Sequence, residues 1–176
     1  LAAKTFSMTA YYDSMISNWF HRDQNDHINN FSSAGKLSSK LRYGENPHQS
    51  AGLYKSSQQR SGIPYATLLQ GKELSYNNIN DSDAALQLIK EFDKNTPSVA
   101  IIKHANPCGV ASGTSLCEAY TKAFSCDTTS AFGGIIALNQ KIDKATASEI
   151  IKIFTEVIIA PEVSDEAKEI FRSKSN

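Results

Sequence analysis

The sequence has few of the features that mark secreted or membrane-spanning proteins. Its three cysteines, Cys108, Cys117 and Cys126, are too few for a disulfide framework and form no C-x-x-C pair. No uninterrupted apolar run approaches the roughly 20 residues that a membrane helix needs. The first residues, LAAKTFSMTA, lack the basic and then apolar arrangement of a secretory signal. We therefore expect a cytoplasmic protein with reduced thiols and no membrane partner.

The sequence also lacks an excess of charge of either sign. Eighteen Lys and Arg balance eighteen Asp and Glu, so no general field draws the chain to nucleic acid. Any anionic ligand must be held by local groups. The composition, 40% hydrophobic and 20% charged, is that of a soluble globular domain. Because the chain begins at Leu1, within a helical pattern, we expect it to be a piece of a longer protein.

Two segments precede the part of the chain in which strands and helices alternate. Apolar side chains recur at helical spacing from Leu1 through Met8 and Met15 to Trp19, which predicts an amphipathic helix. Residues 21–40 are polar and rich in Asn, Ser and Asp, as in a connection between domains. We expect the helix to lie apart from the rest of the chain or to pack on another chain.

From residue 41 onward the patterns alternate between strand and helix. Short apolar runs predict strands at AGLYK, SVAII, IIAL and VIIA, with SVAII buried on both faces. Helical patterns lie between them, and Asp81 or its neighbours and Thr114 are the expected caps. This order predicts an α/β fold, a layered sheet of substantial parallel character with helices on both faces. Ligands of such sheets bind where loops converge at strand ends.

Lys103 and His104 come directly after the apolar run SVAII. A lysine can hold an anion, and an imidazole that titrates near neutrality can move a proton. The alternative is a solvated strand end with a satisfied histidine. The loop KHANPCGVASG favours function, because Asn-Pro enforces a turn and Gly109 and Gly113 let a ligand approach the backbone before a helix. Gly133 permits a similar approach, or merely relieves the entry to a strand.

Two further segments carry residues suited to binding a nucleotide. Arg42 and Tyr43, in LRYGENPHQ, combine a phosphate-binding guanidinium with a stacking ring. A polar loop without function is the alternative there. Contacts to sugar hydroxyls are available from Asn77, Asn78, Asn80 and Asp81. Helix capping is the alternative for each of these four.

Five ordered motifs give the chain a resemblance to one family. They are KLRYGENPHQ, QGKELSYNNINDSDAAL, KHANPCGVASG, CDTTSAFGGIIALN and EVIIAPE. These resemble successive motifs of the formyltransferase domain in the bifunctional purine-biosynthesis proteins, whose second activity is IMP cyclohydrolase. Five motifs in order are far more specific than any single one. The leading helix is similar to the last helix of the cyclohydrolase domain in that family.

The resemblance implies an organisation and an activity. Residues 1–20 would be the terminal helix of the cyclohydrolase domain, 21–40 a linker, and 41–176 the first of two cytidine-deaminase-like units of the formyltransferase domain. The reaction would transfer a formyl group from 10-formyltetrahydrofolate to the 5-amino group of 5-aminoimidazole-4-carboxamide ribonucleotide, with no metal required. The protein would be a homodimer with active sites between subunits, and the folate-binding residues would lie beyond Asn176.

The resemblance also implies roles for individual residues. His104 would be the proton acceptor and Lys103 the stabiliser of the transition state. Arg42 and Tyr43 match the nucleotide-binding pair of the family. The other nucleotide contacts would be Asn78, Gly133 and Glu156. The match of Asn78 depends on a small gap, so its neighbour Asn77 is the alternative.

Two other functions are alternatives to formyl transfer. Zinc deaminases of the same fold carry H-x-E followed by P-C-x-x-C. Here Asn106 replaces the glutamate, the spacing is collapsed and the second cysteine is absent, so we expect neither deamination nor zinc at Cys108. The second is a nucleotide-binding or assembly fragment that lacks enough of the site for turnover on its own.

Overall fold

The computed structural model describes residues 1–23, 29–56 and 61–174. Within these ranges the elements follow the order α1 (Ala2–His21), β1 (Gly35–Leu41), β2 (Ala51–Ser56), η1 (Ile63–Tyr65), α2 (Tyr76–Lys90), β3 (Ser98–Lys103), β4 (Asn106–Ser112), α3 (Leu116–Cys126), β5 (Gly134–Leu138), α4 (Lys144–Ile150), β6 (Thr155–Ile159) and α5 (Asp165–Arg172). Residues 24–28 of the predicted linker lie outside the described residues.

The three predicted strands SVAII, IIAL and VIIA belong to one four-stranded sheet, in the order β4-β3-β5-β6. β3 pairs antiparallel with both β4 and β5, while β5 and β6 are parallel. The predicted parallel character is therefore limited to one pair of strands. The reason is β4, which the sequence suggested to be loop: this extra strand reverses the chain, so α3 leads into β5 in the direction opposite to β3.

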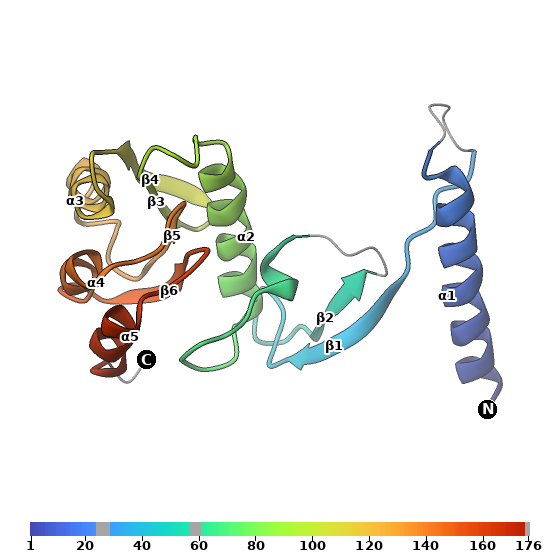
Figure 1. The fold of residues 1–176 in the computed structure, drawn as a ribbon. Coiled ribbons are helices and arrows are strands. Elements are labelled where there is room, and N and C mark those ends of the chain that lie inside the picture. The colour runs from blue at the N-terminus through green and yellow to red at the C-terminus, as the bar shows by residue number, and fades with distance from the viewer. Residues whose placement is uncertain (24–28, 57–60, 175–176) are drawn as a thin grey trace.

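Helices cover both faces of this sheet, as predicted, and Figure 1 shows α2 on one side with α3, α4 and α5 on the other. Successive residues of β3 point to opposite faces. Val99 and Ile101 pack into the core beneath α3 and α4, whereas Ala100 and Ile102 pack against α2. An apolar run without alternation is the expected pattern for a strand buried on both sides. The α/β fold predicted from the sequence is confirmed.

The helix caps differ from those expected. α2 begins one residue after Ser75, whose hydroxyl accepts the backbone N–H of Asn78 at 3.1 Å in a capping box. Asp81 lies in the second turn of α2 and is not its cap. At α3 the cap is Ser115 rather than Thr114.

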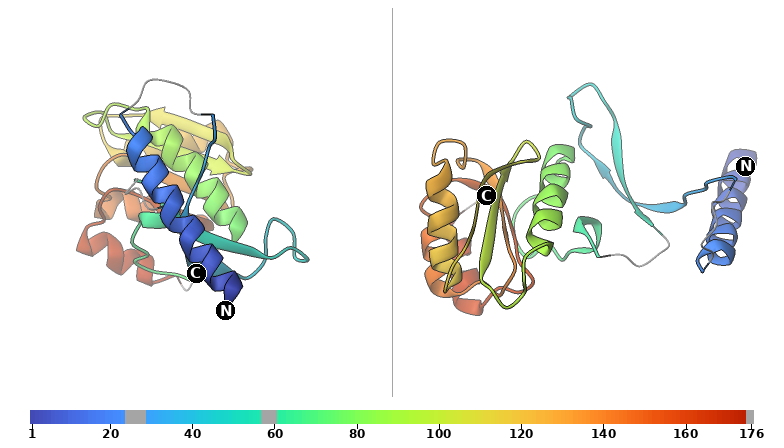
Figure 2. Two further views of the ribbon diagram at one scale, coloured as in Figure 1. Left: turned by 90° about the vertical axis from the view of Figure 1, so that its right-hand side faces the viewer. Right: turned by 90° about the horizontal axis from the view of Figure 1, so that it is seen from above.

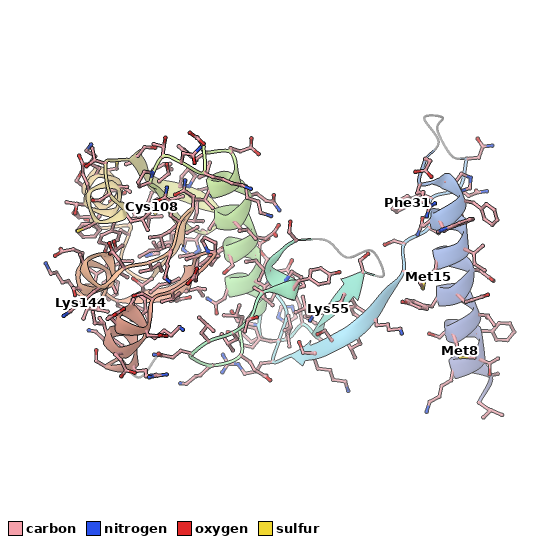
Figure 3. All side chains as sticks on the ribbon, viewed as in Figure 1. Met8, Met15, Phe31, Lys55, Cys108 and Lys144 are labelled. Carbon is pink, nitrogen blue, oxygen red and sulfur yellow. The ribbon has the colours of Figure 1, made fainter. Side chains whose placement is uncertain are left out.

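A helix and a hairpin precede the layered part of the chain. β1 pairs antiparallel with β2, so part of the segment expected to be a linker is a strand. α1 buries none of its residues and lies apart from the sheet in Figure 1 and in the right view of Figure 2. Met8 and Met15, labelled in Figure 3, are 67% and 37% exposed. The helix thus lies apart as expected, while its assignment to another domain stays a prediction.

The length and polarity of the helices bear on membrane insertion. Over the described ranges, no helix is both long and apolar enough to cross a membrane.

Candidate functional site

Strand order brings the predicted residues of three strands to one edge of the sheet. Ile102 of β3 pairs with Ile135 of β5, and Gly134 pairs with Thr155 of β6. The end of β3 and the beginnings of β5 and β6 therefore lie at the same end of the sheet. We call this end of the sheet the β3 edge. It carries Lys103, His104, Gly133 and Glu156.

Lys103 holds the loop that leads into β5. Its ammonium donates to the carbonyl oxygen of Phe132 at 2.8 Å. The next residue, Gly133, has φ 71°, a backbone conformation that favours glycine, and its N–H donates to the Phe154 carbonyl at 2.8 Å. The rings of Phe132 and Phe154 lie 5.6 Å apart. The sequence predicted that Lys103 and Gly133 meet, and the structure confirms it.

A carboxylate lies at the start of the same loop. Asp127 accepts the backbone N–H groups of Thr129 at 3.1 Å and Ser130 at 2.9 Å. Hydrogen bonding to Ser130 is the main cause that lowers the pKa of Asp127, and the charge of Lys103 makes a smaller contribution. The cation of the β3 edge thus has a negative charge in its vicinity before any ligand binds.

His104 lies in the two-residue turn between β3 and β4. It has φ 52° and Ala105 has φ 57°, positive values that a type I′ hairpin turn requires at both central residues. Asparagine and glycine are the usual residues of such turns. The carboxylate of Asp81 in α2 accepts both N–H groups, at 3.2 Å from His104 and 3.0 Å from Ala105. The His104 side chain is exposed, so its imidazole is accessible to a ligand.

The opposite side of the turn is also bonded. The side-chain amide of Asn106 donates to the His104 carbonyl at 2.6 Å. Asn106 and Pro107 themselves begin β4, so the turn lies two residues earlier than the Asn-Pro step predicted. Proline is tolerated there because β4 is the edge strand of the sheet.

Asn78 links α2 to Glu156 of β6. Its side-chain NH₂ donates to the Glu156 carboxylate, and its side-chain oxygen accepts from the Ser75 hydroxyl at 2.9 Å. Asn77 instead donates to the backbone carbonyl of Glu45 at 3.4 Å. The two candidate asparagines therefore point to different partners. Asn78 is part of a helix cap and also reaches the predicted carboxylate.

Arg42 and Tyr43 lie in a loop beside the N-terminus of α2. The Arg42 guanidinium lies 5.1 Å from the centre of the Tyr43 ring. Hydrogen bonds close the loop on itself, with Gly44 N–H donating to the Gln49 carbonyl at 2.8 Å. The contact from Asn77 joins this loop to the first turn of α2. A role of Arg42 and Tyr43 together with the residues of the β3 edge stays a prediction.

The glycines after His104 lie where the chain packs closely on α3. A Cβ at Gly109 would lie 1.9 Å from the Ala123 carbonyl oxygen of α3, and one at Gly113 would lie 2.9 Å from the Ala119 nitrogen. Because neither glycine has a side chain, α3 can pack closely on β4 and on the residue that follows it. This close packing accounts for both glycines, and the approach of a ligand to them stays a prediction.

Cys108, labelled in Figure 3, is a half-buried residue of β4, and burial raises the pKa of its thiol. In the described part of the chain, no group of three or more His, Cys, Asp or Glu side chains is arranged to hold a metal ion.

Sequence reasoning missed the partners that hold the β3 edge. The sequence suggests Asp81 as a cap or a sugar contact and gives no indication of the Phe132 carbonyl. One signal was available for Asp81: the turn His104-Ala105 has neither the asparagine nor the glycine that positive φ favours. Such a turn needs partners from outside the hairpin.

Curated relatives match nearly the whole chain. The bifunctional purine biosynthesis protein PurH of Agrobacterium fabrum is 58% identical over 177 residues, which cover 99% of this chain and 33% of the relative. The proteins of the same name from Sinorhizobium medicae and Brucella anthropi are each 58% identical over 178 residues, or 100% of this chain and 33% of the relative. The chain thus spans about a third of the length of these relatives.

A match to a protein family covers the same extent. The family is described as the AICARFT/IMPCHase bienzyme, and the matched residues are 1–176. It includes all five motifs and every residue of the β3 edge. The resemblance seen in the motifs is confirmed, and the chain belongs to the AICARFT/IMPCHase bienzyme family.

Proposed function

We propose that this chain is part of a cytoplasmic enzyme of purine biosynthesis. It would contribute to transfer of the formyl group of 10-formyltetrahydrofolate to the 5-amino group of 5-aminoimidazole-4-carboxamide ribonucleotide. The complete protein would also cyclise the product to IMP and would act as a homodimer with active sites between subunits. The observation that carries the proposal is the meeting of Lys103, His104, Gly133 and Glu156 at one sheet edge in a member of this family.

The proposed chemistry assigns distinct tasks to His104 and Lys103. The 5-amino nitrogen is a weak nucleophile that forms a bond to the formyl carbon while the bond from that carbon to N10 of the folate breaks. His104 accepts the proton that the amine loses, and N10 takes up a proton as the leaving group. Lys103 stabilises the negative charge that develops on the formyl oxygen. Holding both reactants in place supplies further acceleration.

The remaining predicted residues would bind the ribonucleotide. Arg42 is suited to its phosphate and Tyr43 to stacking on its base. The hydrogen-bonded pair Asn78 and Glu156 offers donors and acceptors for ribose hydroxyls. Gly133 leaves space for close approach at the β3 edge.

A binding or assembly fragment without turnover on its own is the second candidate. It is supported by the length of the chain, which covers 33% of its relatives. Folate-binding residues would then come from the part of the protein outside this chain. If the isolated chain binds the ribonucleotide but transfers no formyl group, the isolated chain is a binding fragment. This result would leave the function proposed for the complete protein unchanged.

Kinetics of His104→Ala in the complete protein test the proposed function. Loss of a general base lowers the rate by about a hundred- to ten-thousand-fold. The kcat of His104→Ala should therefore decrease by a factor in this range, while the affinity for the ribonucleotide is largely kept. His21→Ala is the matched control, because His21 is an exposed histidine of α1, outside the β3 edge. Near-normal turnover of His104→Ala with weakened binding would show that His104 is not the base.

A further inference from the structure

The turn that presents His104 depends on one carboxylate from a different element. Asp81 lies in α2, whereas His104 and Ala105 join β3 to β4. The two oxygens of Asp81 accept one backbone N–H each, at 3.2 Å from His104 and 3.0 Å from Ala105. Asp81 is 23 residues from His104 and 24 from Ala105 in the sequence. Both of its hydrogen bonds from this distant position go to the two central residues of one turn.

The turn needs such a partner because of its residues. Both central residues have positive φ, which glycine adopts freely and side chains with a Cβ adopt with strain. Neither position holds glycine. The N–H groups of successive residues with this backbone point outward together and form a concavity that suits an anion. Asp81 fills that concavity and thereby stabilises the strained backbone.

No other task in α2 occupies Asp81. The N-terminus of the helix is capped by Ser75, whose hydroxyl accepts the Asn78 N–H, and Asp81 lies beyond the first turn. Its oxygens bond to backbone nitrogens, so it does not act as the acidic partner of the His104 imidazole. Its effect on His104 must therefore pass through the main chain.

We propose that Asp81 is a positioning residue, which fixes the turn between β3 and β4 so that His104 and Lys103 reach the substrate in reactive orientation. This inference rests on the proposed function for its effect on formyl transfer. Asn78, one helical turn earlier on α2, donates its side-chain NH₂ to the carboxylate of Glu156 in β6. One face of α2 thus aligns β6 and the β3–β4 turn with each other.

Kinetics of the complete protein test the catalytic part of this inference. A displacement of about 1 Å at a reacting group can cost a hundredfold in rate, so Asp81→Ala should lower kcat by about ten- to a hundredfold. The Michaelis constant for the ribonucleotide should change by less than about threefold, because Asp81 holds the turn and not the ligand. Asp83→Ala, an exposed carboxylate of the same helix, is the control and should keep wild-type kinetics.

A second variant grades the effect. Asp81→Asn keeps one acceptor oxygen but presents an NH₂ group to the other backbone N–H. Its kcat should lie between those of the wild type and Asp81→Ala. It also provides the test if Asp81→Ala does not fold. Asp81 variants with kcat equal to that of Asp83→Ala, or with a raised Michaelis constant and unchanged kcat, would overturn the inference.

Amide hydrogen exchange tests the structural part without any activity. The His104 and Ala105 amides, followed by NMR, should exchange at least about ten times faster in Asp81→Ala than in the wild type or in Asp83→Ala. Unchanged exchange at both amides would overturn the role of Asp81. If the complete wild-type protein transfers no formyl group, the proposed function fails, and the exchange rates still decide whether Asp81 holds the turn.

Discussion

At the residue scale, three positions at the β3 edge have positive φ: His104, Ala105 and Gly133. Only Gly133 adopts this backbone freely, since the other two carry a Cβ. The positive φ of His104 and of Ala105 each costs about 1–2 kcal/mol of stability relative to an ordinary backbone conformation. Hydrogen bonds from elements elsewhere in the chain offset this strain. Residues held in this manner are typical of functional sites, where orientation outweighs local stability.

Arg42 is expected to contribute binding rather than turnover. A phosphate contact present before and during the reaction is uniform binding, so Arg42→Ala should raise the Michaelis constant for the ribonucleotide with little change in kcat. Loss of one charge-assisted hydrogen bond of about 1.5–3 kcal/mol predicts a rise of roughly ten- to a hundredfold. Steady-state kinetics at saturating folate measure both constants. Lys40→Ala, an exposed cation of β1, should leave them unchanged.

Gly109 is expected to be essential for packing. In Gly109→Ala the new Cβ would lie 1.9 Å from the Ala123 carbonyl oxygen, which forces α3 away from β4. Overpacking of this kind costs about 1–3 kcal/mol of unfolding free energy or more. Gly62→Ala is the matched control, because the nearest atom to its new Cβ would be Pro64 Cδ at 3.7 Å. Equal denaturation midpoints for the two variants would contradict the packing role of Gly109.

At the element scale, the strands with an apolar run were predictable and the polar strands β1 and β4 were not. β3 and β5 are short apolar runs, a pattern that burial on both faces imposes, and the edge strand β6 is apolar from Val157 to Ile159. β4 contains Asn106, Pro107 and Gly109, each typical of loops, and it forms because its backbone pairs with β3. β1 is similarly polar and pairs with β2. Pairing between strands is a tertiary interaction that periodicity does not report.

In the candidate site, the positions of the residues were predictable from the sequence, whereas the contacts that hold them were not. The positions of Lys103, His104, Gly133 and Glu156 at one sheet edge follow from strand order, and motif resemblance predicted all four. The contacts of Asp81 and of the Phe132 carbonyl depend on how α2 and the loop before β5 pack on the sheet. Those contacts join residues far apart in the chain, so no local pattern encodes them.

α3 is expected to make the fold sensitive to alkali. Its Tyr120 is 3% exposed, and burial raises the pKa of the phenol to about 12. A folded pKa above the unfolded value of about 10 means that the neutral phenol stabilises the fold below pH 10 and that this stability is lost as pH rises toward 12. The unfolding free energy should therefore fall over this window, by at most about 1.4 kcal/mol per pH unit for one group.

Tyr120→Phe isolates this titration, because it keeps the ring that stacks on Phe124 with centres 6.0 Å apart. Urea unfolding of both proteins between pH 9 and pH 12 gives the comparison. The variant should lose less stability than the wild type across this interval. If the unfolding free energies of the two proteins fell equally with pH, ionisation of Tyr120 would not contribute to the loss of stability in alkali.

At the scale of the whole molecule, the chain has two parts that share few contacts. The three-layer part from α2 to α5 contains the buried residues of both core clusters. α1 buries no residue, and the β1–β2 hairpin lies between it and this part in Figure 1. Its exposed apolar side chains include Met8, Tyr12 and Phe20. A core that closes without α1 is expected to keep its stability without it.

Removal of residues 1–23 tests this independence. The thermal unfolding of the three-layer part should shift by less than about 0.5 kcal/mol in free energy, the range of ordinary surface changes. Circular dichroism of the shortened and the original chain measures the shift, and the helical signal should decrease by the contribution of α1 alone. A large loss of stability would mean that α1 packs on the core in solution.

The exposure of α1 has a consequence for optical measurements. Trp19 is the only tryptophan of the sequence, and 56% of its surface is exposed on α1. The Phe20 ring and the Arg22 guanidinium lie beside it, at 5.0 Å and 4.8 Å. Intrinsic tryptophan emission therefore reports the environment of α1 and is insensitive to melting of the three-layer core. A blue shift of this emission would be a direct optical signal that another surface has covered the helix.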